Sequence, residues 1–126
     1  VMRLKRLDHL VLTTADLEAC LHFYRELLGM KPVFDGKRHA LLFGEQKINI
    51  HTEKAQYLPA ARYPGYGNLD ICLVTEGPIE AVRRELEGKQ IEIEVGIVER
   101  TGALGAVKSI YLRDPDGNLV ELCSYE

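Results

Sequence analysis

Apolar residues recur at helical spacing in two segments of the chain and alternate with polar residues in most of the others. In the first helical segment they form one stripe, made of Leu17, Cys20, Leu21, Tyr24, Leu27 and Leu28. Thr14 is the expected N-cap of this helix, and Gly29 followed by Pro32 ends it. The second helix is predicted from Pro78 to Glu87, with Gly88 just beyond its end.

Short alternating or apolar segments surround both helices and predict strands. One strand precedes each helix and three follow it. The predicted strands cover residues 7–13, 32–35, 38–43, 47–52, 68–75, 91–98, 107–112 and 119–124. Both halves of the chain therefore follow the order strand, helix, strand, strand, strand, which predicts an α+β fold.

This order repeats after roughly sixty residues, which is too long for a solenoid unit and about half of one domain. The segment Leu7–Leu12 parallels Asn68–Leu73, because each has a polar residue inside an apolar strand. The pattern predicts a single domain, residues 1–126, with a first module at about 5–53 and a second at about 68–126. Residues 54–67 have no clear periodicity and are interpreted as the linker.

Glu121 is the most informative residue of the chain. It lies within the apolar run Leu119–Cys123, directly after the turn sequence Asp114–Asn118. A carboxylate in such a strand is costly to bury unless it is paired, hydrogen-bonded or bound to a cation. Arg100 and Arg113 are the candidate partners within the protein. The turn itself does not have the glycine and glutamate spacing of an EF-hand loop.

Three further polar residues occupy related positions in the two halves. Side-chain alternation and the repeat make His9 equivalent to Asp70, and Asn49 equivalent to Glu121. If a pseudo-twofold axis relates the halves, the four side chains point to a common centre, which a divalent cation would explain. His51 follows Asn49 on the same face, so either residue could fill the fourth position. Taken singly, His9 could be a core histidine and Asp70 a backbone cap.

The segment Glu99–Ala106 links two predicted strands and contains two glycines and one cation, Arg100. Two interpretations are open: a mobile lid whose arginine binds an anionic group of a substrate, or a long hairpin loop with a solvated arginine. Tyr111, in the next strand, could face the same centre as Glu121. Its orientation stays ambiguous, because both faces of that strand are apolar.

The net charge limits the classes of binding partner, and the cysteine content indicates the cellular compartment. A net charge of −3 argues against a nucleic-acid or anionic-membrane surface. No apolar run is long enough to span a bilayer, and residues 1–6 lack a signal-peptide core, so a cytoplasmic protein is expected. Cys20, Cys72 and Cys123 have apolar neighbours and are interpreted as buried free thiols in a reduced compartment.

Three segments resemble the vicinal oxygen chelate superfamily, which includes glyoxalase I, bleomycin- and fosfomycin-resistance proteins and extradiol dioxygenases. These are residues 7–12, 23–30 and 113–121, and residues 100–111 further resemble a glyoxalase-domain subgroup with members labelled virulence proteins. The resemblance implies two βαβββ modules that form a curled mixed sheet around a metal cup. Because dimerisation often completes that cup, a homodimer is expected.

By position, the resemblance matches His9 with the first-strand metal ligand and Glu121 with the last-strand ligand. Asp70 stands where many members have a histidine, and Asn49 stands where glyoxalase I has a glutamate. One imidazole and two carboxylates form an oxygen-rich donor set. This set favours Mn²⁺, Ni²⁺, Zn²⁺ or Mg²⁺ over Fe²⁺, unless His51 supplies a second imidazole.

The expected function is that of a metal-dependent, glyoxalase-like enzyme of the lyase or isomerase type. Its divalent cation would polarise a small oxygen-bearing metabolite, with Glu121 or His51 as general base. Arg100, Tyr111 and Asn49 are the expected substrate-binding residues. The alternatives are a metal-free ligand-sequestering protein of the bleomycin-resistance type and an extradiol-type dioxygenase. The chain has no Trp and 7% aromatic residues, which argues against a groove that binds its ligand by aromatic stacking.

Overall fold

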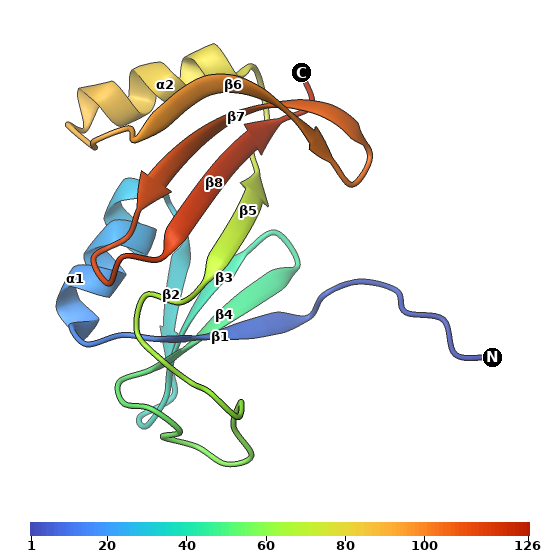
Figure 1. Ribbon diagram of the computed structural model, residues 1–126. Helices are drawn as coiled ribbons and strands as arrows, with labels where there is room; N and C mark the ends of the chain where they lie inside the picture. Colours follow the sequence, from blue (N-terminus) through green and yellow to red (C-terminus); the bar gives the residue numbers. More distant parts are fainter. The chain divides into compact units, whose positions relative to one another are not determined.

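Two four-stranded mixed sheets, one in each half of the chain, form the framework of the protein (Figure 1). The computed structural model describes residues 1–126, which divide into two compact units, Val1–Tyr66 and Gly67–Glu126. Each unit contains one sheet and one helical segment. This confirms the α+β class and the strand, helix, strand, strand, strand order of each half.

The first unit has the strand order β1-β4-β3-β2, in which β1 runs parallel to β4 and the other pairs are antiparallel. Its elements are β1 (His9–Thr13), α1 (Leu17–Leu21) continued by the π-helical segment η1 (His22–Leu27), β2 (Lys31–Phe34), β3 (His39–Phe43) and β4 (Gln46–His51).

The second unit repeats this topology with the strand order β5-β8-β7-β6, and here β5 runs parallel to β8. Its elements are β5 (Asp70–Val74), α2 (Ile79–Gly88), β6 (Val95–Gly102), β7 (Gly105–Arg113) and β8 (Leu119–Ser124). No helix in either unit has the length and apolar character needed to cross a membrane.

The helix ends differ in detail from the prediction. Asp16, rather than Thr14, is the N-cap of α1, because its side chain accepts a hydrogen bond from Ala19 N at 3.1 Å. Pro78 is the N-cap of α2 rather than its first helical residue, and Gly88 is the last residue of that helix. The second half of the first predicted helix, His22–Leu27, is π-helical rather than α-helical.

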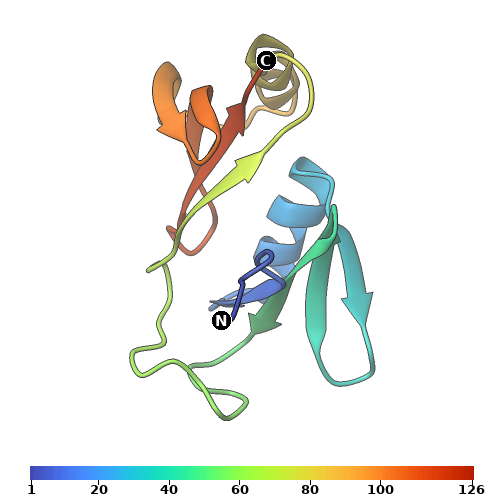
Figure 2. The same ribbon diagram turned by 90° about the vertical axis from the view of Figure 1, so that its right-hand side faces the viewer.

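Each sheet buries one face under the helical segment of its own unit. Figures 1 and 2 show α1 and α2 lying along one face of their respective sheets. Alternate strand residues fill that face and are at most 5% exposed: Leu12, Leu41, Ile48 and Ile50 in the first unit, and Ile110, Leu112, Val120 and Leu122 in the second. The opposite face of each sheet carries the polar residues singled out in the sequence.

The predicted turn before β8 is a hydrogen-bonded anchor as well as a reversal. Asp114 accepts bonds from the backbone amides of Asp116 and Asn118, each at 2.9 Å. The buried Asn118 side chain donates to Asp114 Oδ2 at 2.7 Å and accepts from Leu69 N at 2.9 Å. This network fixes the start of β8 beside β5 and thereby sets the register of Glu121.

Candidate functional site

The strand registers place the polar residues of the two units at equivalent positions. His9 pairs with Lys47, and Asn49 stands two residues further along β4. Asp70 pairs with Leu119, and Glu121 stands two residues further along β8. The equivalence of His9 with Asp70, and of Asn49 with Glu121, therefore agrees with the register of backbone pairing.

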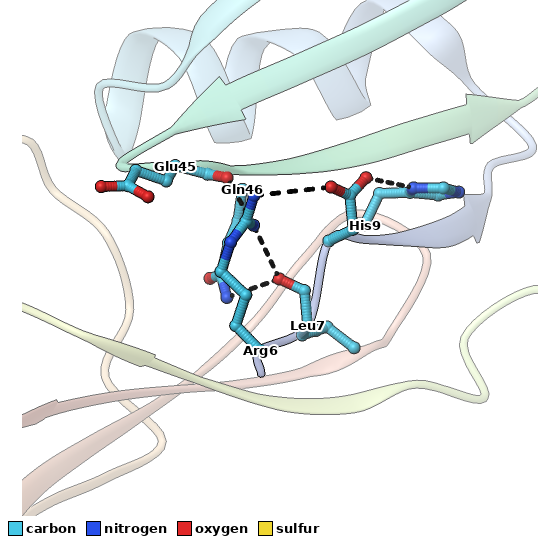
Figure 3. A network of polar contacts seen from close by, with 6 residues as sticks. Arg6, Leu7, His9, Glu45 and Gln46 are labelled. Carbon is cyan, nitrogen blue, oxygen red and sulfur yellow. Dashed lines mark hydrogen bonds and ion pairs between the residues drawn. The ribbon is translucent and has the colours of Figure 1, made fainter. Parts of the chain in front are cut away.

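His9 is oriented by the residue that precedes it. Its Nδ1 lies 2.9 Å from Asp8 Oδ2 on the exposed face of β1 (Figure 3). A carboxylate at Nδ1 favours the tautomer with its proton on that nitrogen, which leaves Nε2 as an acceptor or a metal ligand. The Asp8–His9 pair therefore has the arrangement that commonly orients a metal-binding histidine.

Arg6 and the β3–β4 hairpin support this pair. Arg6 Nη2 lies 3.6 Å from Asp8 Oδ1, and Arg6 Nη1 donates to the carbonyl oxygen of Glu45 at 2.9 Å (Figure 3). Gln46 donates to the Leu7 carbonyl oxygen at 3.1 Å. The hydrogen bond to His9, followed by the nearby charge of Arg6, lowers the pKa of Asp8. Asp8 is consequently ionised at neutral pH.

Asn49 and His51 lie on the same face of β4, as the sequence predicts, and both are half-buried. The His51 ring makes an edge-to-face contact with Tyr57, with 5.2 Å between ring centroids. Burial, together with the charge of Arg38, lowers the pKa of His51. Its imidazole is therefore neutral at pH 7 and can accept a proton.

These two residues belong to a pocket of about 310 Å³ on the first unit. Its wall includes Arg38, whose guanidinium carbon lies 4.0 Å from the Tyr57 ring centroid. Lys47 lines another part of the pocket. Tyr57 belongs to the segment interpreted as a linker, and its packing against Arg38 and His51 makes part of that segment a pocket wall.

Glu121 is half-buried and accepts a hydrogen bond from Ser109 Oγ to its Oε2 at 2.6 Å. Tyr111 stands directly opposite Glu121 in the β7–β8 register, which settles the orientation that the sequence left open. Arg100 Nε donates to Tyr111 Oη at 3.0 Å. The second unit thus brings Glu121, Ser109, Tyr111 and Arg100 onto one face.

Neither arginine proposed as a partner of Glu121 pairs with it. Arg100 binds Tyr111, and Arg113 forms two hydrogen bonds with Glu94, each at 3.1 Å. The hydrogen bond to Glu94 raises the pKa of Arg113, and the charges of Glu94 and Asp70 act in the same direction. Ser109 provides the hydrogen bond that a half-buried carboxylate requires.

The segment that carries Arg100 is neither a mobile lid nor a long loop. Residues up to Gly102 continue β6, and β7 begins at Gly105, so only two residues form the hairpin turn. Leu104 N donates to Tyr125 Oη at 3.0 Å and holds the turn. Cross-strand pairing along the whole segment overrides the flexibility expected from its two glycines. Arg100 also lines a pocket of about 470 Å³ on this hairpin.

Cys72 departs from the expectation of three buried thiols. Cys20 and Cys123 are buried, whereas Cys72 is exposed and is paired with Glu121 in the β5–β8 register. Partial burial of its thiol, together with a hydrogen bond to Cys123 and the charge of Glu121, raises the pKa of Cys72 to about 12. The thiol is therefore protonated at neutral pH.

The predicted metal ligands are divided between the units, with His9 and His51 in the first and Asp70 and Glu121 in the second. Within neither unit do three or more His, Cys, Asp or Glu side chains gather into a metal-binding group. The first unit brings Asn49 and His51 together, and the second unit brings Glu121, Tyr111 and Arg100 together.

Sequence reasoning missed several residues that the structure places beside these side chains. Two had usable signals, because Asp8 directly precedes His9 and Ser109 shares the parity of Tyr111. Arg38, Lys47 and Tyr57 had no such signal. Their association depends on how the segment after β4 folds back over the sheet.

Comparison with known proteins identifies the family. The family model described as the Glyoxalase/Bleomycin resistance protein/Dioxygenase superfamily matches residues 6–122, nearly the whole chain. This chain belongs to that superfamily. Its fold and its two βαβββ units are those expected of this superfamily.

Several superfamily members are similar over nearly their full length. Virulence protein STM3117 of Salmonella typhimurium is 47% identical over 125 residues, which cover 98% of this chain and 87% of that protein. The crystal structure of STM3117 has a TM-score of 0.95, covering 99% of this chain and 100% of that one.

Two further superfamily members are similar over nearly the whole of this chain. The integron cassette protein VCH_CASS1 of V. cholerae has a TM-score of 0.94 at 43% identity, covering 100% of this chain and 99% of that one. The glyoxalase domain-containing protein RDO1 of Mycosarcoma maydis is 43% identical over 126 residues, 99% of this chain and 71% of that protein.

Proposed function

We propose that this protein is a metal-dependent, glyoxalase-like enzyme of the lyase or isomerase type that acts on a small oxygen-bearing metabolite. The observation that carries the proposal is the 2.9 Å contact between Asp8 and His9 Nδ1, which leaves Nε2 for a cation. In the proposal, His9, Asp70 and Glu121 hold one divalent ion, and His51 is either its fourth ligand or a neighbouring general base.

The donor atoms fit such an ion in chemical type. Ser109 Oγ donates a hydrogen bond to Glu121 Oε2 at 2.6 Å, so Glu121 Oε1 is the oxygen proposed to bind the metal. Asp70 is exposed and lies on the same sheet face as Glu121. It stands two residues before Cys72, the residue that pairs with Glu121. Imidazole and carboxylate donors suit Mn²⁺, Ni²⁺, Zn²⁺ or Mg²⁺, and the proposal favours these ions over Fe²⁺.

When bound, the cation would act as a Lewis acid toward oxygen atoms of the substrate. The remaining chemistry is assigned to side chains of the protein. His51 is neutral at pH 7 and is the proposed general base where it does not bind the metal. Where it does, Glu121 released from the metal is proposed for that role. Arg100 holds the phenol of Tyr111 at 3.0 Å, and these two residues with the Asn49 amide are proposed to orient the substrate.

The proposed setting is a reduced cytoplasm, which the three free thiols support, because cysteines remain unpaired there. The proposed assembly is a homodimer without nucleic-acid or membrane partners. The net charge of −3 supports the latter part of the proposal.

Metal titration of the purified protein tests the proposal directly. We expect one equivalent of Mn²⁺, Ni²⁺ or Zn²⁺ to bind, and His9→Ala and Glu121→Ala each to abolish stoichiometric binding. His22→Ala and Glu92→Ala are the matched controls, since both residues are exposed and lie outside the proposed site.

Failure of all these ions, and of Fe²⁺, to bind would contradict the enzyme proposal. It would favour the alternative of a metal-free ligand-sequestering protein, for which the pocket beside Tyr57 offers a binding surface without a metal. Stoichiometric Fe²⁺ binding in preference to the other ions would instead favour the dioxygenase alternative.

A further inference from the structure

The open faces of the two sheets have opposite charge character. In the second unit, the equivalent positions on β5 and β8 carry two carboxylates, Asp70 and Glu121. In the first unit, those positions carry His9 and Asn49, and the adjoining pocket contains two cations, Arg38 and Lys47. This pocket is locally basic although the whole chain has a net charge of −3. We therefore expect its ligand to be an anion.

Arg38 is held in place without a direct ion pair. Its guanidinium lies over the Tyr57 ring, with 4.0 Å between the guanidinium carbon and the ring centroid. Tyr57 Oη in turn donates a hydrogen bond to the Lys37 carbonyl oxygen at 3.4 Å. Neither Arg38 nor Lys47 forms an ion pair within 4.0 Å, in contrast to Arg6, Arg25, Arg83 and Arg113.

The carboxylate in the pocket, Asp35, is engaged by the backbone. Its Oδ1 accepts hydrogen bonds from Lys37 N at 2.9 Å and from Arg38 N at 2.6 Å. These bonds lower the pKa of Asp35 and close the turn between β2 and β3. Asp35 therefore stabilises the turn that presents Arg38, while the guanidinium group keeps its donors for a ligand.

The pocket also has an apolar floor of limited length. Val33, Ala40 and Leu42 line it between the polar residues. Lys47 and His51 stand four residues apart on β4, which corresponds to about 13 Å along a strand. Together with the volume of about 310 Å³, this spacing fits a small organic molecule with a charged group at one end.

We propose that this pocket binds the carboxylate of a small organic acid, with Arg38 as the carboxylate ligand and the apolar floor under the body of the molecule. A planar guanidinium can bind a carboxylate through two parallel hydrogen bonds, and stacking on Tyr57 preorganises it for that contact. Lys47, which pairs with His9 in the β1–β4 register, binds a second oxygen-bearing group of the ligand. That this acid is the substrate class rests on the proposed function; its binding does not.

The test uses metal-free protein in the presence of a chelator, with hexanoate and its neutral amide as probes. We expect hexanoate to shift the backbone amide NMR signals of Ala40, Asn49 and Tyr57, and hexanamide to bind at least tenfold more weakly. Arg38→Gln is expected to weaken hexanoate binding by about tenfold or more, and Lys47→Gln by less.

Arg84→Gln and Lys31→Gln are the matched controls. Arg84 lies on α2 of the other unit, Lys31 lies on the same sheet outside the pocket, and both variants should bind hexanoate like the unchanged protein. Arg38→Lys keeps the charge but loses the planar group, so it should restore only part of the affinity lost in Arg38→Gln. Signals outside the pocket report whether each variant is folded.

Equal binding of hexanoate and hexanamide would overturn this inference, as would an unchanged affinity in Arg38→Gln or no saturable binding in the millimolar range. Because the measurement contains no metal, its failure is separate from failure of the proposed function. A protein that binds metal but not carboxylates would refute the pocket assignment alone.

Discussion

Ser109 donates a hydrogen bond to Glu121 across neighbouring strands, with 2.6 Å between Ser109 Oγ and Glu121 Oε2. Ser109 is fully buried and Glu121 is half-buried. The bond satisfies one carboxylate oxygen within the sheet and gives the other a defined direction. It also answers why an acidic residue is tolerated in an apolar strand.

Removal of this hydroxyl should destabilise the protein. Ser109→Ala leaves Glu121 Oε2 without its donor, and we expect the free energy of unfolding to fall by about 1.5–3 kcal/mol, as for hydrogen bonds to charged groups. Urea unfolding measures the change. Adding Glu121→Gln in a double-mutant cycle isolates the coupling between the two side chains, and additive effects would show that the contact contributes nothing.

Asp8→Asn should weaken metal binding without unfolding the protein. The carboxylate at His9 Nδ1 orients the ring, and loss of such a group typically costs 10–100-fold in metal affinity. Glu45→Gln removes a similar exposed charge from the same unit, yet only the backbone carbonyl of Glu45 takes part in the network. Competitive metal titration should separate the two variants; equal affinities would contradict the role given to Asp8.

Cys72 should react slowly with alkylating reagents in metal-free protein. Its pKa of about 12 lies above the ordinary value of 9.0. The protonated thiol therefore contributes stability that is complete below pH 9.0 and is lost as pH rises toward about 12. Mass spectrometry of iodoacetamide labelling between pH 7 and 10 follows this, and Glu121→Gln should shift the labelling profile to lower pH. Rapid labelling at neutral pH would refute the expectation.

Asn118→Ala should destabilise the second unit more than an ordinary surface substitution. It removes the acceptor for Leu69 N, in a part-buried hydrogen bond, and the donor to Asp114 Oδ2, in a buried one. Losing these two hydrogen bonds costs roughly 1–3 kcal/mol each, so the free energy of unfolding should fall by several kcal/mol in thermal unfolding. Asn118→Asp keeps an acceptor and serves as comparison. Wild-type stability of Asn118→Ala would show that the turn is not an anchor.

Local patterns predicted the elements and the equivalence of their polar positions well. The alternation around His9 and Glu121 and the helical stripe that includes Cys20 both depend on neighbours close in sequence. The β6–β7 hairpin was mispredicted, because cross-strand pairing extends Arg100 and its neighbours into a strand despite Gly102 and Gly105. Glycine count alone does not reveal that pairing.

The sequence by itself therefore determined the βαβββ order of each half and the parity of His9, Asn49, Asp70 and Glu121. These features follow from the periods of strand and helix, which are local properties of the chain. Tertiary structure decided the partners: Ser109 for Glu121, Arg100 for Tyr111, and Tyr57 for Arg38. Such contacts depend on register and on how the chain folds back on itself, which residue type and spacing leave undetermined.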